Sequence, residues 1–166
     1  MRADRILMLV GAVLVFGVVN WQIATKERLR TGGQTVYLEL APVDPRSLMQ
    51  GDYMALDFAL AGQIRNAVSQ GTVNPEAEGP LVAILQLDAR RVGRFSRLDN
   101  GGPLNPGEVR FRFRIRNEQV WLGTNAFFMQ EGDAERYRAA RFGEFHVSDS
   151  GEAMLVDLRD AGLRKL

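Results

Sequence analysis

The strongest constraint on the fold is a strict alternation of apolar and basic residues over positions 109–116. The apolar residues are Val109, Phe111, Phe113 and Ile115, and the basic residues between them are Arg110, Arg112, Arg114 and Arg116. Successive side chains point to opposite faces in a β-strand. The pattern therefore predicts a strand with one face in a hydrophobic core and a row of guanidinium groups on the other.

The arginine row has two interpretations. A strand advances about 3.3 Å per residue, so the four guanidiniums would extend over roughly 20 Å. Such a row could face phosphate headgroups, an acidic partner or another polyanion. Alternatively, it is a solvated face whose arginines pair with carboxylates on neighbouring strands, as in any amphipathic strand. No aromatic residue alternates with the arginines on that face, so a surface that stacks nucleic-acid bases is not favoured.

Other segments share this period of two and are separated by short polar turns. Further strands are predicted at 35–41, 53–60, 81–87, 92–98, 142–147 and 153–158, with 92–98 as the hairpin partner of 81–87, and a strand or hairpin is predicted at 120–129. Short helices are predicted at 62–70 and at 133–140, the second capped by Asp133. No helix of crossover length alternates with the strands. We therefore expect a mainly β domain, an antiparallel sandwich or barrel-like structure with one or two short helices.

Two groups of large side chains are assigned to the core. In the strand predicted at 53–60, one face is wholly apolar and consists of Met54, Leu56, Phe58 and Leu60. In the segment 120–129, the large residues are Trp121, Phe127 and Phe128. We interpret both groups as core residues rather than as parts of a binding site.

The N-terminal segment, residues 1–25, is predicted to be a membrane anchor. Residues 6–19 are an unbroken run of apolar residues and glycine, and Trp21 follows where an indole ring would lie at the far interface. A helix rises about 1.5 Å per residue, so residues 6–24 nearly span a hydrocarbon core of about 30 Å. A cleaved signal peptide is less favoured because no small-x-small site follows the run. A buried soluble helix is disfavoured because the run has no polar face.

Basic residues flank the apolar run on both sides, so the positive-inside rule does not choose an orientation. They are Arg2 and Arg5 before the run and Lys26, Arg28 and Arg30 after it. Residues 26–34 are predicted to be a juxtamembrane linker, in which Gly32 and Gly33 stop the helix and act as a swivel. Residues 35–166 would then form the β-rich domain.

Composition excludes several kinds of site. The chain has no cysteine, which excludes disulfides, thiolate zinc sites and cysteine nucleophiles. The formal net charge of +1 lacks the basic excess expected of a general nucleic-acid binder. The one histidine, His146, lies in a strand pattern without clustered carboxylates, so we interpret it as structural. No phosphate-binding loop, dinucleotide fingerprint or nucleophile elbow is present. We expect no metal and no cofactor, and enzymatic activity is not favoured.

The segment 42–58 concentrates residues with special backbone demands. Pro42 and Pro45 fix φ near −65°. Asp44 can accept hydrogen bonds from backbone amides ahead of it, and Gly51 can supply a positive φ. Arg46 is expected to pair with Asp52 and brace the turn. We predict a tight polar turn that leads directly into an apolar strand.

The sequence Gly51-Asp52-Tyr53, followed by Leu56 and the aromatic Phe58, resembles the GDYXXLXY family of bacterial membrane-anchored proteins. The resemblance extends roughly over residues 36–158 and includes Asp44-Pro45-Arg46 and the segment 131–137. The family pattern ends in tyrosine where this chain has phenylalanine. The candidate binding residues carried over from the motif are Asp44, Pro45, Arg46, Gly51, Asp52, Tyr53, Leu56 and Phe58.

The resemblance implies a single-pass protein of the bacterial inner membrane with a periplasmic C-terminal domain. It also implies an accessory or binding module that works with a multi-spanning membrane partner. The alternative is an enzyme, or a domain that binds a small ligand or lipid near the motif. Ser47 before Gly-Asp is similar to the serine of type I signal peptidases, but neither Lys26 nor Lys165 is placed to act as its base.

Overall fold

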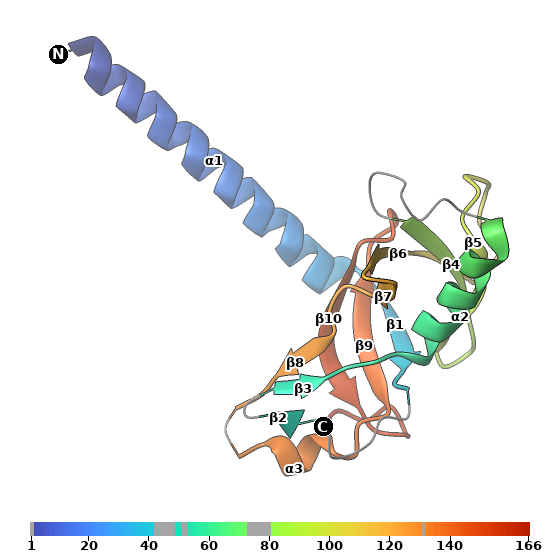
Figure 1. The fold of residues 1–166 in the computed structure, drawn as a ribbon. Helices are drawn as coiled ribbons and strands as arrows, with labels where there is room; N and C mark the ends of the chain where they lie inside the picture. Colours follow the sequence, from blue (N-terminus) through green and yellow to red (C-terminus); the bar gives the residue numbers. More distant parts are fainter. Residues whose placement is uncertain (1, 42–48, 51–52, 73–80, 131) are drawn as a thin grey trace.

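A long N-terminal helix projects from a domain of short strands in this computed structural model (Figure 1). The structure describes residues 2–41, 49–50, 53–72, 81–130 and 132–166. Helix α1 spans Arg2–Gly32, and its N-terminus lies far from the domain. The shorter helices are α2, Ala59–Ala67, which continues into a π-helical turn η1, Val68–Thr72, and α3, Ala134–Tyr137.

Within the described residues, the strands form three small antiparallel sheets. The first has the order β1-β9-β10 and the second β2-β3-β8, while the third has the order β5-β4-β6-β7. Their bounds are Gln34–Glu39 for β1, Phe142–Val147 for β9, Ala153–Arg159 for β10, Met49–Gln50 for β2, Tyr53–Ala55 for β3, Ala126–Phe128 for β8, Gly93–Leu98 for β5, Leu81–Leu87 for β4, Glu108–Arg116 for β6 and Gln119–Trp121 for β7. An isolated bridge between Tyr37 and Val92 links the first sheet to the third. Together the sheets form a half-barrel, which confirms the predicted antiparallel β class.

An aromatic cluster holds the sheets together. Phe145 on β9 packs edge-on against Phe111 on β6 and against Phe58, with ring centroids 5.5 Å and 5.4 Å apart. Phe145 and Phe111 are completely buried, and Ile64 of α2 is also buried in this core. The apolar face of β6 thus points inward, as the alternation at 109–116 predicts.

The strand predicted at 53–60 is too long. Strand β3 ends at Ala55 and α2 begins at Ala59, so Leu60 lies in a helix. The segment that follows Phe58 is rich in alanine and places Leu60 and Ile64 four residues apart, which suits an amphipathic helix. The prediction that this segment's apolar face is buried is nevertheless confirmed, for Met54, Leu56, Phe58 and Leu60.

Two further predictions need correction. The segment 120–129 is neither one strand nor a hairpin: Gly123, with a φ of +83°, separates β7 from β8, and the two strands belong to different sheets. Phe128 is 77% exposed, so its assignment to the core is wrong. Asp133 precedes α3 but its side chain forms no capping hydrogen bond, because its backbone is helical rather than extended as a capping residue requires.

The junction between α1 and the domain is packed. Leu29 on the last turns of α1 is only 7% exposed, and the carbonyl of Arg30 accepts a hydrogen bond from Nδ1 of His146 on β9. A Cβ on Gly33 would lie 2.9 Å from the Cβ of His146. The helix stops at the glycine pair as predicted, but contacts with β9 and β10 take the place of the expected swivel.

A buried carboxylate begins the polar face of β6. Glu108 accepts hydrogen bonds from the backbone N–H of Asn105 at 2.9 Å and from Nη2 of Arg97 at 3.0 Å. The Asn105 amide and the Arg97 guanidinium lower the pKa of Glu108, and they outweigh the opposing effect of burial. The folded state therefore favours the ionised form of this carboxyl.

Replacing Glu108 with glutamine should destabilise the domain near neutral pH. Because the folded-state pKa lies below the unfolded-state value, the carboxylate stabilises the fold above the unfolded-state pKa. This contribution is lost as pH falls through the folded-state pKa, so the difference between the two proteins should shrink in acid. Urea denaturation over a pH series measures it, with Glu39→Gln on the exposed face of β1 as the control. An equal difference at every pH would contradict the ionic explanation.

Candidate functional site

The motif is only partly within the described residues. Asp44, Pro45, Arg46, Gly51 and Asp52 lie outside them, and so does the expected pair between Arg46 and Asp52.

The described motif residues divide into core and surface positions. Leu56 and Phe58 are buried, and Phe58 belongs to the aromatic cluster around Phe145. Tyr53 is half-buried on β3, where its ring centroid lies 6.1 Å from that of Phe128 on the neighbouring strand β8. The motif therefore supplies core side chains from its second half and an aromatic surface from Tyr53.

The arginines on β6 differ in whether they have hydrogen-bond and ion-pair partners, depending on their place along the strand. Near the start, Arg110 donates from Nε to Asp99 at 3.1 Å and from Nη2 to the carbonyl of Gly102 at 3.1 Å. Burial raises the pKa of Asp99, but hydrogen bonds from the Gly101 amide and from Arg110 outweigh burial, and the pKa lies below its usual value. This part of the row is a paired, charge-balanced face.

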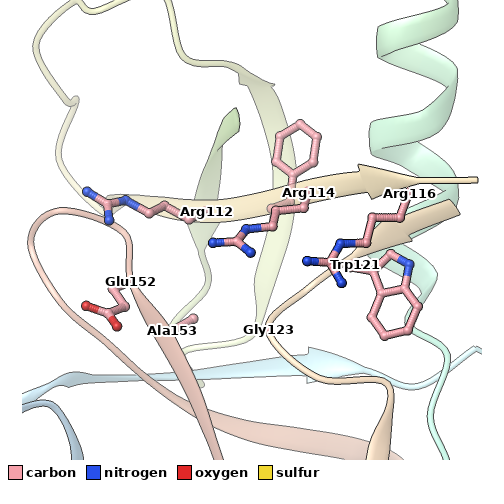
Figure 2. A pocket seen from close by; sticks show the side chains of 8 residues that line it. Arg112, Arg114, Arg116, Trp121, Gly123, Glu152 and Ala153 are labelled. Carbon is pink, nitrogen blue, oxygen red and sulfur yellow. The ribbon is translucent and has the colours of Figure 1, made fainter. Parts of the chain in front are cut away.

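The later arginines form a different environment. Figure 2 shows Arg112, Arg114 and Arg116 extending to the same side of β6, next to the loop that carries Glu152. Within the described part of the chain, none of these three side chains forms an ion pair or a hydrogen bond. They line a pocket of about 490 Å³, whose other lining residues are Phe113, Trp121, Gly123, Glu152 and Ala153.

A tight turn brings Trp121 to this pocket. Asn117 and Glu118 both have positive φ, 49° and 62°, as a two-residue type I′ hairpin turn requires. The turn sets the register of β6 and β7, so that Trp121 lies opposite Arg114. The buried indole Nε1 has no hydrogen-bond partner among the described residues. Trp121 is only half-buried, and the polar pair Asn117-Glu118 between the two strand patterns is the signal that could have placed it opposite Arg114.

The turn between β9 and β10 forms the opposite wall. The amide N–H of Arg112 donates to the carbonyl of Gly151 at 2.7 Å. Gly151 has a φ of +85°, and a Cβ there would lie 3.1 Å from the Cβ of Arg110. This close approach brings Glu152 to the edge of the pocket. Sequence reasoning missed Glu152, because no local pattern links residues 148–152 to β6.

Glu152 connects the pocket to the N-terminal helix. Its carboxylate forms an ion pair with the ammonium group of Lys26 on α1. Among the described residues, the pocket lining therefore has three guanidiniums without an ion-pair partner and one carboxylate that is paired with Lys26, so the pocket is cationic. No group of three or more acidic or histidine side chains is placed to hold a metal ion in the described ranges.

The segment Met8–Gly32 of α1 is long and apolar enough to cross a membrane or to act as a signal sequence. Its large apolar side chains are exposed, among them Leu14, Phe16 and Trp21. It is therefore not a core helix of the β domain.

Comparison with known proteins agrees with the motif. The protein-family model described as "GDYXXLXY protein" matches residues 15–158, which cover the end of the apolar run and most of the β domain. No curated protein and no solved structure matched the chain. Since the family match extends over most of the sequence, the chain belongs to the GDYXXLXY protein family, whose function is unknown.

Proposed function

We propose that this protein is a membrane-anchored binding or accessory module. Its β domain would lie on the periplasmic side of a bacterial inner membrane and work with an integral membrane partner. One observation carries the proposal: α1 exposes its apolar side chains along most of its length, while its last turns pack against β9 and β10. A helix arranged in this way holds the domain at a set position close to the bilayer.

The same junction supports a retained anchor over a cleaved signal. Lys26, Leu29 and the carbonyl of Arg30 all contact the domain. Cleavage directly after the apolar run would leave the end of α1 on the domain but separate it from the part of the helix that lies in the membrane. Burial of Leu29 and the hydrogen bond to His146 make the end of α1 an integral part of the domain.

The exposed aromatic surface beside the motif is the proposed contact with the partner. Phe128 on β8 is 77% exposed, and the Tyr53 ring packs beside it. Exposed aromatic side chains of this kind are enriched at protein interfaces. The second half of the motif is packed into the core, where Phe58 contacts Phe145, which supports a binding surface in preference to an enzymatic cavity at the motif.

Single cysteines test the location and the partner surface together, because the chain has no cysteine of its own. We expect a membrane-impermeant cysteine-reactive photo-crosslinker, added to spheroplasts, to modify both Phe128→Cys and Ser69→Cys. Ser69 is exposed on η1, outside the proposed surface. After illumination, only the cysteine at position 128 should crosslink to an integral membrane polypeptide.

The outcomes separate the two parts of the proposal. Modification of both cysteines only after the membrane is permeabilised would contradict the periplasmic location. Crosslinks of equal yield from positions 69 and 128, or from neither, would contradict the partner surface. A cysteine at position 3, before the apolar run, reports the opposite side of the membrane and should react only after permeabilisation.

A further inference from the structure

We propose that the cationic pocket on β6 binds the phosphate of an anionic phospholipid, and that an adjoining apolar groove takes part of its acyl chain. The phosphate-binding part consists of Arg112, Arg114 and Arg116, with Trp121 as a wall. The inference rests on the proposed function only in requiring that α1 lies in the membrane. It requires neither the periplasmic orientation nor a protein partner.

The guanidiniums are suited to phosphate. An arginine presents several N–H donors in a planar fork that matches phosphate oxygens, and such charge-assisted hydrogen bonds are stronger than neutral ones. Arg110 already has a carboxylate partner, whereas Arg112, Arg114 and Arg116 have none among the described residues. Their shared pocket therefore has donors and positive charge to offer an anion.

The carboxylate of Glu152 at the pocket edge does not serve as the anionic partner of the three arginines. Glu152 is directed to Lys26, with which it forms an ion pair, and no ion pair joins it to the three arginines in the described ranges. Trp121 adds a buried indole N–H that has no partner in the described structure. Such an unsatisfied donor is costly unless a ligand or water accepts from it.

An apolar groove next to the pocket distinguishes a lipid from a free phosphate ion. This groove lies between α1 and β10, has a volume of about 480 Å³, and is lined in part by Trp21, Ile23 and Met154. Lys26 and Met154 also line the groove. Lys26 is paired with Glu152 of the cationic pocket, and Met154 follows Ala153 of that pocket in the chain. Cationic and apolar sites that meet in this way match the headgroup and chain of one lipid.

The cationic pocket lies beside the part of α1 that we expect at the depth of the lipid headgroups. Trp21 and Ile23 are the last large apolar residues of the exposed run, and Lys26 follows three residues after Ile23. Three residues of helix correspond to about 4.5 Å along the axis. Since Lys26 contacts Glu152 at the pocket edge, the three guanidiniums lie close to the membrane surface, where lipid phosphates are concentrated.

Binding can be followed through Trp121, because Trp21 is the only other tryptophan. Delipidated full-length protein carrying Trp21→Phe in non-ionic detergent is titrated with short-chain phosphatidylglycerol, short-chain phosphatidylcholine or inorganic phosphate. We expect a saturable change in Trp121 fluorescence with phosphatidylglycerol at concentrations where the other two have no effect. Native mass spectrometry should show one phosphatidylglycerol retained.

The test variant is Arg114→Gln with Arg116→Gln, and its matched control is Arg65→Gln with Arg94→Gln. All four arginines are exposed and free of ion pairs in the described structure. Each lost guanidinium contact should weaken phosphatidylglycerol binding about tenfold, whereas the control should bind like the parent. Thermal unfolding of both variants shows whether the domain remains folded.

Three outcomes would overturn the inference. Equal binding of phosphatidylcholine, which has the same phosphate but no net charge, would show that the pocket does not select an anionic lipid. Equal binding of inorganic phosphate would show a free-anion site. No binding, or equal weakening by both pairs of substitutions, would show that the pocket is not the site. None of these results bears on the cysteine-labelling test, so the proposed function can fail or stand separately.

Discussion

Replacing Phe145 with alanine should lower the free energy of unfolding by about 3–5 kcal/mol, the usual range for a buried phenylalanine. Its ring is completely buried and contacts the rings of Phe58 and Phe111, so the substitution would open a cavity between β9, β6 and the motif segment. Urea denaturation of the full-length protein in non-ionic detergent, followed by circular dichroism, measures the loss.

Phe128→Ala is the matched control for this experiment. It removes the same ring from a side chain that is 77% exposed, so the free energy of unfolding should change little. If both substitutions cost the same, the aromatic cluster would not be the element that joins the sheets.

Replacing Gly151 with alanine should destabilise the domain by about 2–4 kcal/mol, from the strain of a positive φ and from overpacking. A Cβ at this position would lie 3.1 Å from Arg110 Cβ and 3.2 Å from the backbone N of Phe111. The β9–β10 turn would have to move away from β6 and carry Glu152 with it. The ion pair to Lys26 would then weaken.

Gly101→Ala separates the two causes. Gly101 has a similar φ of +80°, but nothing lies within 4 Å of a Cβ placed there. It should show the backbone strain alone, about 1–2 kcal/mol. Urea denaturation of both variants gives the comparison, and in proteins that also carry Trp21→Phe the Trp121 fluorescence reports whether the neighbouring pocket changes. Equal losses in the two variants would mean that the close approach to β6 contributes nothing.

Local patterns predicted much of the β domain correctly. The alternation at 109–116 identified β6 and its buried face, and the pairing of 81–87 with 92–98 was also correct. The strand predicted at 53–60 was too long because its last residues fit two patterns. Leu60 continues the apolar alternation of a strand, but it also lies four residues before Ile64, as in an amphipathic helix, and the helix is what forms. Phe128 was misplaced because hydrophobicity alone does not reveal which strand face is covered.

By itself, the sequence determined the apolar N-terminal helix, the antiparallel β class and the family, since these depend on composition, short periodicities and a motif. Only the tertiary structure decided that Arg110 is paired while the next three arginines share a pocket with Trp121 and Glu152. The physical reason is that strand periodicity sets which face a side chain occupies, whereas its partners come from distant segments. Here those segments are the β9–β10 turn, seated on β6 through Gly151, and the end of α1, docked through Leu29 and Lys26.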